Sequence, residues 1–300
     1  MKRIFSPGKL MLTSEYVAVD GALVLAVPTK LGQEFFFDES DDEKSLIYWN
    51  AFHQDQLWLE TVIDYKTWTI IETNDPKASE FILKVLRNVQ QLSDFKFNSN
   101  YSYHLKTNLQ FPSDFGLGSS STLMSNLGEW AEIDPFILNE ISLGGSGYDV
   151  AVAKENSAIL YNRFPERTYD KVVFDPVFKD DLIFIHLNQK QDTRDGISHY
   201  KSKPTSTELI NEYSALTRTI AVTQDLEEFS QLMTIHEQKL SDFLEIPTVK
   251  EKYFQNCPSF VKSLGAWGGD FVLTSKFGDY EAYFKSRGFD RIFSWLDLIN

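Results

Sequence analysis

The chain has 300 residues, of which 42% are hydrophobic and 24% are charged, a composition that excludes a disordered protein and allows one or two folded domains. A formal net charge of −14 argues against a surface that binds nucleic acid or an anionic membrane. The single cysteine, Cys257, excludes an intramolecular disulfide and favours a reducing, cytoplasmic location. The longest apolar run, residues 22–27, is too short to span a bilayer.

The N-terminal third of the chain predicts mainly β-structure. Residues 3–37 alternate short apolar runs with turn signals, and residues 46–52 and 56–63 are predicted to pair as strands. Apolar side chains recur at a helical period from residue 76 to residue 92, which predicts the first long helix. Residues 101–107 alternate again as a strand, which leads into a glycine-rich loop.

The rest of the chain mixes helices with short strands. The predicted helices cover residues 120–132, 135–142, 148–154, 206–222, 225–243, 247–255 and 278–287, and the predicted strands cover residues 157–162, 182–187, 271–274 and 290–295. Asp225 is predicted to cap the helix that it begins. Loop residues gather between Pro165 and Pro176, which indicates a weak domain boundary there.

The loop Phe115-Gly-Leu-Gly-Ser-Ser-Ser-Thr122 lies directly before a predicted helix. Glycines let backbone N–H groups approach a ligand closely, and the unpaired N–H groups and positive dipole end of a helix point to the same place. Such an arrangement typically binds phosphate. Serine hydroxyls add groups that bind phosphate oxygens or Mg²⁺. The alternative is a serine-rich helix cap after a tight turn.

Three further stretches occur with this loop in one order along the chain: Ser6–Gly21, Gly145–Asp149 and Gly265–Asp270. Together the four resemble the motifs of the GHMP kinases, the superfamily of galactokinase, homoserine kinase, mevalonate kinase and phosphomevalonate kinase. The similar motifs are P-G-K-x-x-L-x-x-E, P-x-x-x-G-L-G-S-S, S-G-x-D and a C-terminal glycine-rich segment. The resemblance is greatest to the mevalonate and phosphomevalonate kinase branch, in a bacterial form with Gly-Tyr-Asp-Val-Ala.

The resemblance implies an α+β fold with two domains. Residues 1–165 would form a nucleotide-binding domain similar to domain 2 of ribosomal protein S5. Residues 166–300 would form a ferredoxin-like domain, with the active site between the two.

The resemblance also implies roles for the motif residues. Asp149 would be the catalytic carboxylate beside the acceptor hydroxyl, with a helix N-cap as the alternative. Lys9 would offset charge on the transferred phosphoryl group or the acceptor, with a surface lysine as the alternative. Mg²⁺ would bind Ser120 and Glu140, although Glu140 lies in a segment shorter than in most relatives. The residues implied in nucleotide binding are Gly116, Leu117, Gly118, Ser119, Ser120 and Ser121.

The acceptor side carries two departures from the family pattern. Trp267 stands where relatives have glycine, and Arg194 is either a contact to an anionic acceptor or an exposed arginine. The residues implied in substrate binding are Glu15, Gly147, Tyr148, Arg194, Gly265, Trp267, Gly268 and Gly269.

The function that the resemblance implies is an ATP- and Mg²⁺-dependent kinase that acts on a small molecule, with mevalonate or a related isoprenoid precursor as the first candidate acceptor. The alternatives are a phosphomevalonate kinase, an enzyme similar to diphosphomevalonate decarboxylase, and a non-catalytic ligand sensor on the same scaffold. We expect a monomer or homodimer with no nucleic-acid or membrane partner.

Overall fold

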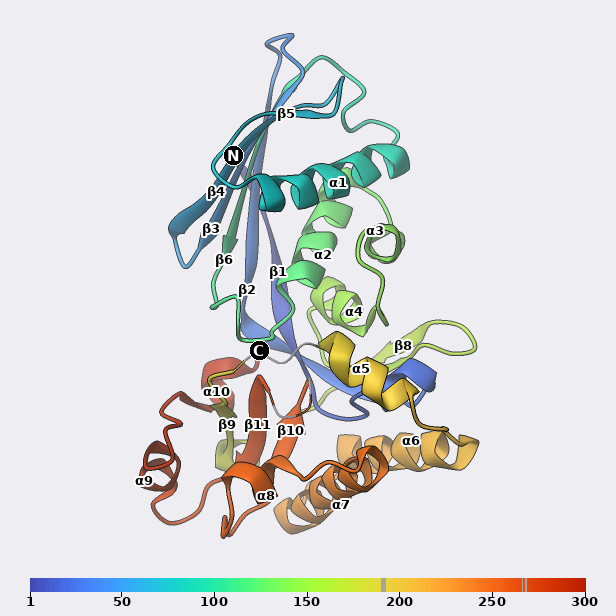
Figure 1. Cartoon of the computed structure of the whole chain (residues 1–300), viewed down its shortest axis with the longest axis vertical. Coiled ribbons are helices and arrows are strands. Elements are labelled where there is room, and N and C mark those ends of the chain that lie inside the picture. The colour runs from blue at the N-terminus through green and yellow to red at the C-terminus, as the bar shows by residue number, and fades with distance from the viewer. Residues whose placement is uncertain (190–192, 266, 268) are drawn as a thin grey trace. The chain divides into compact units, whose positions relative to one another are not determined.

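The computed structural model describes residues 1–189, 193–265, 267 and 269–300, and these residues include an eight-stranded and a four-stranded sheet (Figure 1). The strands of the larger sheet are β1 (Lys2–Met11), β2 (Val24–Ser40), β3 (Leu46–His53), β4 (Gln56–Asp64), β5 (Thr69–Thr73), β6 (Ser102–Leu109), β7 (Ile159–Asn162) and β8 (Thr168–Lys171). Their order is β5-β4-β3-β6-β2-β7-β8, and β1 also pairs with β2. The β3–β6 pair is parallel.

The smaller sheet has the order β10-β11-β9-β12, and its pairs are antiparallel. Its strands are β9 (Leu182–His186), β10 (Lys262–Leu264), β11 (Phe271–Ser275) and β12 (Ile292–Ser294). The α-helices are α1 (Pro76–Leu92), α2 (Ser119–Ala131), α3 (Pro135–Ser142), α4 (Tyr148–Glu155), α5 (Thr193–Lys201), α6 (Thr207–Val222), α7 (Leu226–Leu244), α8 (Val249–Tyr253), α9 (Tyr280–Lys285) and α10 (Trp295–Leu298). Short 3₁₀ helices are η1 (Val17–Asp20) and η2 (Lys179–Asp181).

The chain divides into two units, each built from several stretches. The first unit comprises Met1–Gly8, Leu31–Ser113 and Gly118–Asn156, and the second comprises Lys9–Lys30, Asp114–Leu117 and Ser157–Asn300. The strand β2 contributes to both: its first residues pair with β7 in the second unit, and its later residues pair with β6 in the first. The domains 1–165 and 166–300, which were defined by family likeness, stay a prediction.

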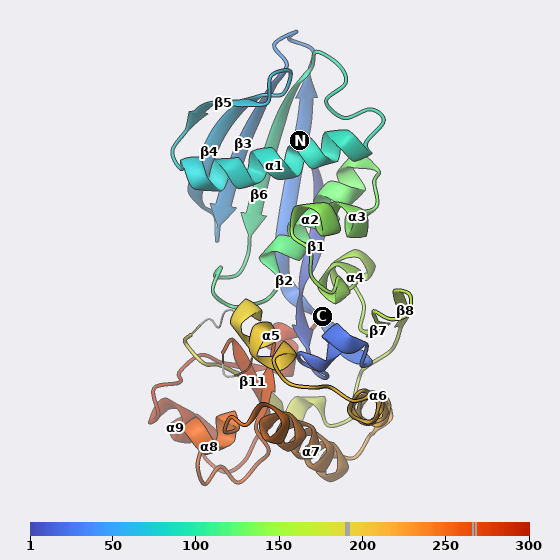
Figure 2. The same ribbon diagram turned by 45° about the vertical axis from the view of Figure 1, so that its right-hand side comes forward.

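In the first unit, α1 and α2 cover one face of the sheet (Figures 1 and 2). The apolar positions of α1 repeat at three- and four-residue intervals and are buried at Ile82, Val85 and Val89, as the periodicity predicts. The centre of this core is aromatic, with the Phe35 and Trp130 rings packed edge to face at a centroid distance of 5.7 Å. This packing fixes α2, and therefore its N-terminus, against the sheet.

In the second unit, every residue of β9 is buried. β9 is the central strand between β11 and β12, so its Leu-Ile-Phe-Ile run packs on both faces. The helices α6 and α7 pack together, and α7 and α8 both contact β10 (Figure 1). β10 leads directly into the segment that contains Gly265 and Trp267.

The long periodic elements agree with the sequence predictions. The helices predicted at 76–92 and 135–142 have those bounds, and Asp225 caps α7 through the N–H of Glu228. The strands β5, β8 and β10 and the helices α5 and α10 were not predicted, because most are too short to show a period. The prediction of a strand over 290–295 is wrong at its end, where α10 begins at Trp295.

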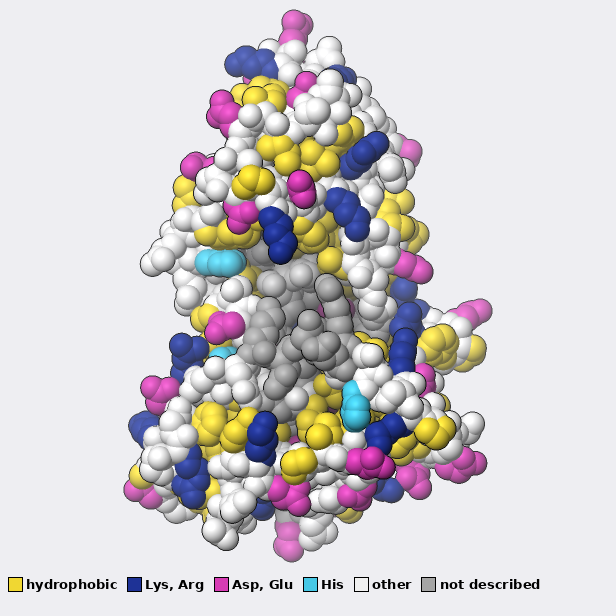
Figure 3. Space-filling view, in the orientation of Figure 1, with side chains coloured by type: hydrophobic (Ala, Val, Ile, Leu, Met, Phe, Trp, Pro, Cys, Tyr) yellow, Lys and Arg dark blue, Asp and Glu magenta, His cyan; other side chains and the backbone are white. Residues whose placement is uncertain are grey.

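Charged side chains of both signs are interspersed on the face shown in Figure 3. Within the described residues, no helix combines the length and the apolar character that crossing a membrane requires.

Candidate active site

The loop before α2 has the conformation that its glycines predict. Gly116 and Gly118 have φ values of 67° and 85°, in the left-handed region that favours glycine. Gly118 is the N-cap of α2, and no side-chain hydrogen bond caps this helix in the described structure. The Ser121 hydroxyl donates to the Gly118 carbonyl at 2.8 Å, whereas Ser120 is exposed. Among the predicted serines, Ser121 is therefore engaged within the helix.

The start of α4 repeats this pattern. Its N-cap is Gly147, with φ 86°, and again no side-chain hydrogen bond caps the helix among described atoms. Asp149 is the second helical residue, half-buried, and its Oδ1 accepts the Val150 N–H at 3.0 Å. The interpretation of Asp149 as an N-cap is thus wrong. Tyr148 is half-buried beside it.

The two uncapped starts differ from those of seven other α-helices in the described part of the chain. Side chains cap α1, α3, α6, α7, α8, α9 and α10. In the first unit α2 and α4 pack against each other (Figure 2). Helix starts without a side-chain cap leave backbone N–H groups for water or a ligand, and these two belong to the GLGSS and SGYD motifs.

A pocket of about 140 Å³ lies in the first unit beside the start of α2. It is lined by Gln33, Trp49, Ala51, Phe52, His53, Trp58, Ala78, Phe81, Ile82, Thr107, Leu109, Ser119, Ser120 and Leu123. The His53 and Trp58 rings stack with centroids 5.0 Å apart, and Trp58 keeps 39% of its surface exposed. Burial lowers the pKa of His53, so its imidazole is neutral near pH 7. The flat aromatic faces in this pocket lie beside a loop of the kind that binds phosphate, and such faces suit stacking with the base of a nucleotide.

In the second unit, Lys9 lies against the loop that contains Gly116. Its Nζ donates to the Gly116 carbonyl at 3.0 Å, and its backbone N–H donates to the Leu117 carbonyl at 3.0 Å. The side chain is half-buried. The interpretation of Lys9 as a plain surface lysine is therefore wrong, and a cation is fixed at this loop.

The same loop touches the C-terminal glycine-rich segment through Asp270. A Cβ at Gly116 would lie 2.2 Å from Asp270 Oδ2, and a Cβ at Gly265 would lie 3.2 Å from it. Asp270 is 8% exposed, and its backbone has a φ of 54°. Glycine at residue 116 is therefore needed for this close approach.

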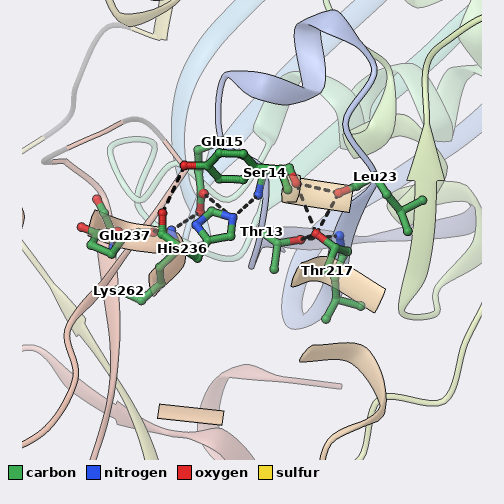
Figure 4. Close-up of polar contacts among 11 residues, drawn as sticks. Thr13, Ser14, Glu15, Leu23, Thr217, His236, Glu237 and Lys262 are labelled. Atoms are coloured by element: carbon green, nitrogen blue, oxygen red, sulfur yellow. Dashed lines mark hydrogen bonds and ion pairs between the residues drawn. The ribbon is translucent and has the colours of Figure 1, made fainter. Parts of the chain in front are cut away.

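Glu15 lies in a buried polar cluster with Lys262, Glu237 and His236 (Figure 4). Lys262 Nζ is 2.7 Å from Glu15 Oε1 and 3.4 Å from Glu237 Oε2. His236 Nε2 accepts the Ser14 N–H at 2.7 Å, which places the imidazole proton on Nδ1. Glu15, predicted to bind substrate, is 1% exposed and faces this cluster.

Burial controls the charges of the cluster. It raises the pKa of Glu15 from 4.5 to about 7, against the opposing effect of Lys262. It also raises the pKa of Glu237. Burial first, and Lys262 second, lower the pKa of His236 well below its ordinary value, so this imidazole is neutral.

This raised pKa predicts a pH dependence of stability. Protonation of Glu15 stabilises the fold fully below pH 4.5, its unfolded pKa, and this contribution is lost as pH rises through about 7. The change, 7 − 4.5, corresponds to about 3 kcal/mol. His236 acts oppositely, because its folded pKa is lowered. In urea unfolding between pH 4 and pH 8, Glu15→Gln should therefore gain about 3 kcal/mol relative to the parent. Parallel pH profiles of the two proteins would contradict the prediction.

The remaining predicted residues are distributed as follows. Glu140 is exposed on α3. The Trp267 N–H donates to Tyr16 Oη at 2.8 Å, Gly265 has a φ of 76°, and Gly269 is buried. The backbone of Arg194 is in α5, but its side chain and Gly268 lie outside the described residues.

The fold of the chain is shared by solved structures of small-molecule kinases. Methanococcus jannaschii mevalonate kinase matches it with a TM-score of 0.70 and 14% identity, over 97% of this chain and 96% of that one. Streptococcus pneumoniae phosphomevalonate kinase in complex with phosphomevalonate and AMPPNP matches with a TM-score of 0.68 and 15% identity, over 99% and 97%. Lactococcus lactis galactokinase complexed with galactose matches with a TM-score of 0.62 and 14% identity, over 96% and 88%. No protein-family model and no curated protein matches the sequence.

These likenesses establish the fold. The chain has the mixed α/β fold of the GHMP kinases over nearly its whole length, which confirms the predicted fold class. At identities of 14–15% they carry no residue roles.

Sequence reasoning did not find the aromatic pocket or Lys262. The pocket residues come from β2, β3, β4, α1, β6 and α2, and they are brought together by the strand register and by the packing of the two helices on the sheet. Lys262 is 247 positions from Glu15. A lysine directly after the apolar pair Phe260 and Val261 was the available signal, because lysine is rarely buried without a partner.

Proposed function

We propose that the protein is a kinase that transfers the γ-phosphoryl group of ATP to a small-molecule acceptor. The first candidate acceptor is mevalonate, and phosphomevalonate is the second. The observation that carries the proposal is the pair of uncapped helix starts at Gly118 and Gly147, together with the aromatic pocket beside the first of them. The fold shared with a phosphomevalonate kinase bound to AMPPNP adds support.

In this proposal the triphosphate lies on the loop before α2. Backbone N–H groups at the start of α2 would bind its oxygens, with the Ser119 and Ser120 hydroxyls beside them. Lys9, whose Nζ is at the Gly116 carbonyl, would bring positive charge to this loop. Asp149 would orient the acceptor hydroxyl or take its proton, since phosphoryl transfer depends mainly on positioning and on electrostatics.

Mg²⁺ belongs to the proposal, and the donor atoms suit it. The hydroxyl of Ser120 and the carboxylate of Glu140 are hard oxygen donors, and both residues are exposed. Among the described residues, no group of three or more His, Cys, Asp or Glu side chains is arranged to hold a metal. Phosphate oxygens and water would therefore complete the ligand set. Bound there, the ion would neutralise charge on the phosphates.

The test is direct. The purified protein is incubated with ATP, Mg²⁺ and separate candidate acceptors: mevalonate, phosphomevalonate, galactose and homoserine. We expect acceptor-dependent ADP formation and a phosphorylated product by mass spectrometry. ATP binding without transfer to any acceptor would contradict the proposal and favour a ligand sensor. Carbon dioxide release from diphosphomevalonate would favour the decarboxylase alternative.

The pocket predicts a role for Trp58 in nucleotide affinity. If the base stacks on this ring, Trp58→Ala should weaken ATP binding by roughly 5- to 150-fold, the equivalent of about 1–3 kcal/mol per stacked base. The matched control is Phe95→Ala, an aromatic residue of the same unit that is 47% exposed and does not line the pocket. Calorimetric titration with ATP measures both. Equal ATP affinities of Trp58→Ala and Phe95→Ala would show that the base does not bind in this pocket.

The metal assignment is tested at Glu140. If Glu140 is a ligand, Glu140→Gln should raise the Mg²⁺ concentration that is needed for the half-maximal rate. The melting temperature should stay unchanged, because the side chain is exposed. The control is Glu129→Gln, at an exposed position on α2. Superimposable titrations of Glu140→Gln and the parent would exclude Glu140 from the metal site.

A further inference from the structure

The ammonium of Lys262 is enclosed by the second unit. Its side chain is 0% exposed, whereas every other lysine in a described ion pair keeps at least 13% of its side chain exposed. Lys262 Nζ contacts Glu15 Oε1, Glu237 Oε2 and the Ser263 carbonyl. One charge thus joins the loop after β1, the helix α7 and the strand β10.

The two carboxylates of the cluster are not equivalent. Glu15 Oε1 is 2.7 Å from Lys262 Nζ, and Glu237 Oε2 is 3.4 Å away. Glu237 Oε2 also accepts the Ser263 N–H at 3.1 Å, so it holds the backbone of β10. The short contact with Lys262 therefore belongs to Glu15.

A buried ion pair adds little net stability compared with an apolar pair of similar volume, but it fixes one arrangement of the groups that it joins. Here it fixes a strained turn. Ser14 and Tyr16, on either side of Glu15, have φ values of 67° and 61°. Residues other than glycine keep such values only when their surroundings hold them.

Three successive residues of this turn are each held by a separate contact. The Ser14 N–H donates to His236 Nε2 at 2.7 Å, and Glu15 binds Lys262 at 2.7 Å. Tyr16 Oη accepts the Trp267 N–H at 2.8 Å. Lys262 and Trp267 lie on the same segment, five residues apart. The turn and the glycine-rich segment are therefore cross-linked twice.

We infer that Lys262 is a positioning residue, which by pairing with Glu15 holds the turn Ser14–Tyr16 against the segment that carries Gly265 and Trp267. The consequence for catalysis rests on the proposed function and on the family resemblance, which implies Glu15, Gly265 and Trp267 in substrate binding. A shift of about 1 Å in a positioning element costs up to 10²-fold in rate.

The experiment compares Lys262→Met, Glu15→Gln and the double variant Glu15→Gln/Lys262→Met with the parent. The control is Lys239→Met, which removes an exposed pair with Glu212 in the same unit. Hydrogen exchange is followed by mass spectrometry in peptides covering residues 12–23 and 262–272. Steady-state kinetics with the best acceptor give kcat and KM separately for ATP and acceptor.

We expect Lys262→Met to speed exchange in both segments and to lower kcat/KM for the acceptor by about 10²-fold, with an unchanged KM for ATP. In the double variant the melting temperature should rise above that of Lys262→Met, because Glu15 no longer leaves a buried charge and Glu237 keeps its hydrogen bond from the Ser263 N–H, while exchange stays fast and kcat/KM stays low. The control should match the parent.

Parent-like exchange in both segments of Lys262→Met would overturn the inference. So would a double variant in which melting temperature and kcat/KM recover together, because this indicates a structural role only. If Lys262→Met does not fold, Glu15→Gln and the double variant carry the same comparison. A parent that phosphorylates no acceptor contradicts the proposed function, while the exchange measurement still decides the inference.

Discussion

An Asp149→Asn variant is expected to lose roughly 10²- to 10⁴-fold in kcat, the range measured for positioned acid–base groups, while it still binds ATP. Asparagine keeps the size of the side chain and an oxygen that accepts the Val150 N–H. The loss of one negative charge in the first turn of α4 costs only about 0.3–1 kcal/mol of stability. The substitution therefore removes the ability of the side chain to take a proton, and it leaves the structure around the start of α4 nearly unchanged.

Steady-state kinetics, ATP titration and thermal unfolding measure the three expectations. Asp134→Asn is the matched control, because Asp134 caps α3 in the same unit and asparagine caps helices equally well. A kcat close to that of the parent would remove Asp149 from the mechanism. A low melting temperature with normal kcat would show that Asp149 serves the helix start.

Gly116→Ala is expected to destabilise the protein by about 1–3 kcal/mol more than Gly144→Ala. Both glycines have positive φ values, 67° and 75°, so alanine at either position costs about 1–2 kcal/mol of backbone strain. The difference lies in their surroundings. A Cβ at Gly116 would be 2.2 Å from Asp270 Oδ2 and 2.3 Å from its Cγ, whereas among described atoms none lies within 4 Å of a Cβ at Gly144.

Urea unfolding of the two variants isolates the contact with Asp270, because the backbone term is common to both. If the loop and not Asp270 moves to admit the methyl group, the Gly116 carbonyl that accepts the Lys9 ammonium is displaced as well. Phosphoryl transfer should then fall in Gly116→Ala beyond its loss in stability. Equal free energies of unfolding for the two variants would show that Asp270 and the loop accommodate the added methyl group without a loss of stability.

Local patterns account for what the sequence predicted. The helix at 76–92 has five turns of apolar period, and Asp75 and Pro76 mark its start. The loop before α2 was predicted because its glycines, its serines and the start of the following helix all lie within eight residues. Both cases depend on neighbours along the chain.

Features built from distant residues were not predicted. Trp58 reaches the pocket through the pairing of β3 with β4 and β6, and Phe81 reaches it from α1. Glu15 matched a motif, yet no local pattern indicated that Lys262 would be its partner. The left-handed backbone at Asp270, whose carboxylate lies against Gly116, was likewise not predicted, because aspartate adopts this conformation only at a minority of positions.

The discontinuous composition of the two units imposes an order on biosynthesis. Every residue of the first unit precedes residue 157, so that unit can form while the ribosome is still translating the remainder. Lys9–Lys30 belongs to the second unit, so its packing cannot be completed until Ser157–Asn300 has been translated. Glu15 leaves the ribosome 247 residues before Lys262, which at 5–20 residues per second is roughly 10 to 50 s. For that time the nascent chain carries an acidic turn without its cation, while the second unit is still being completed.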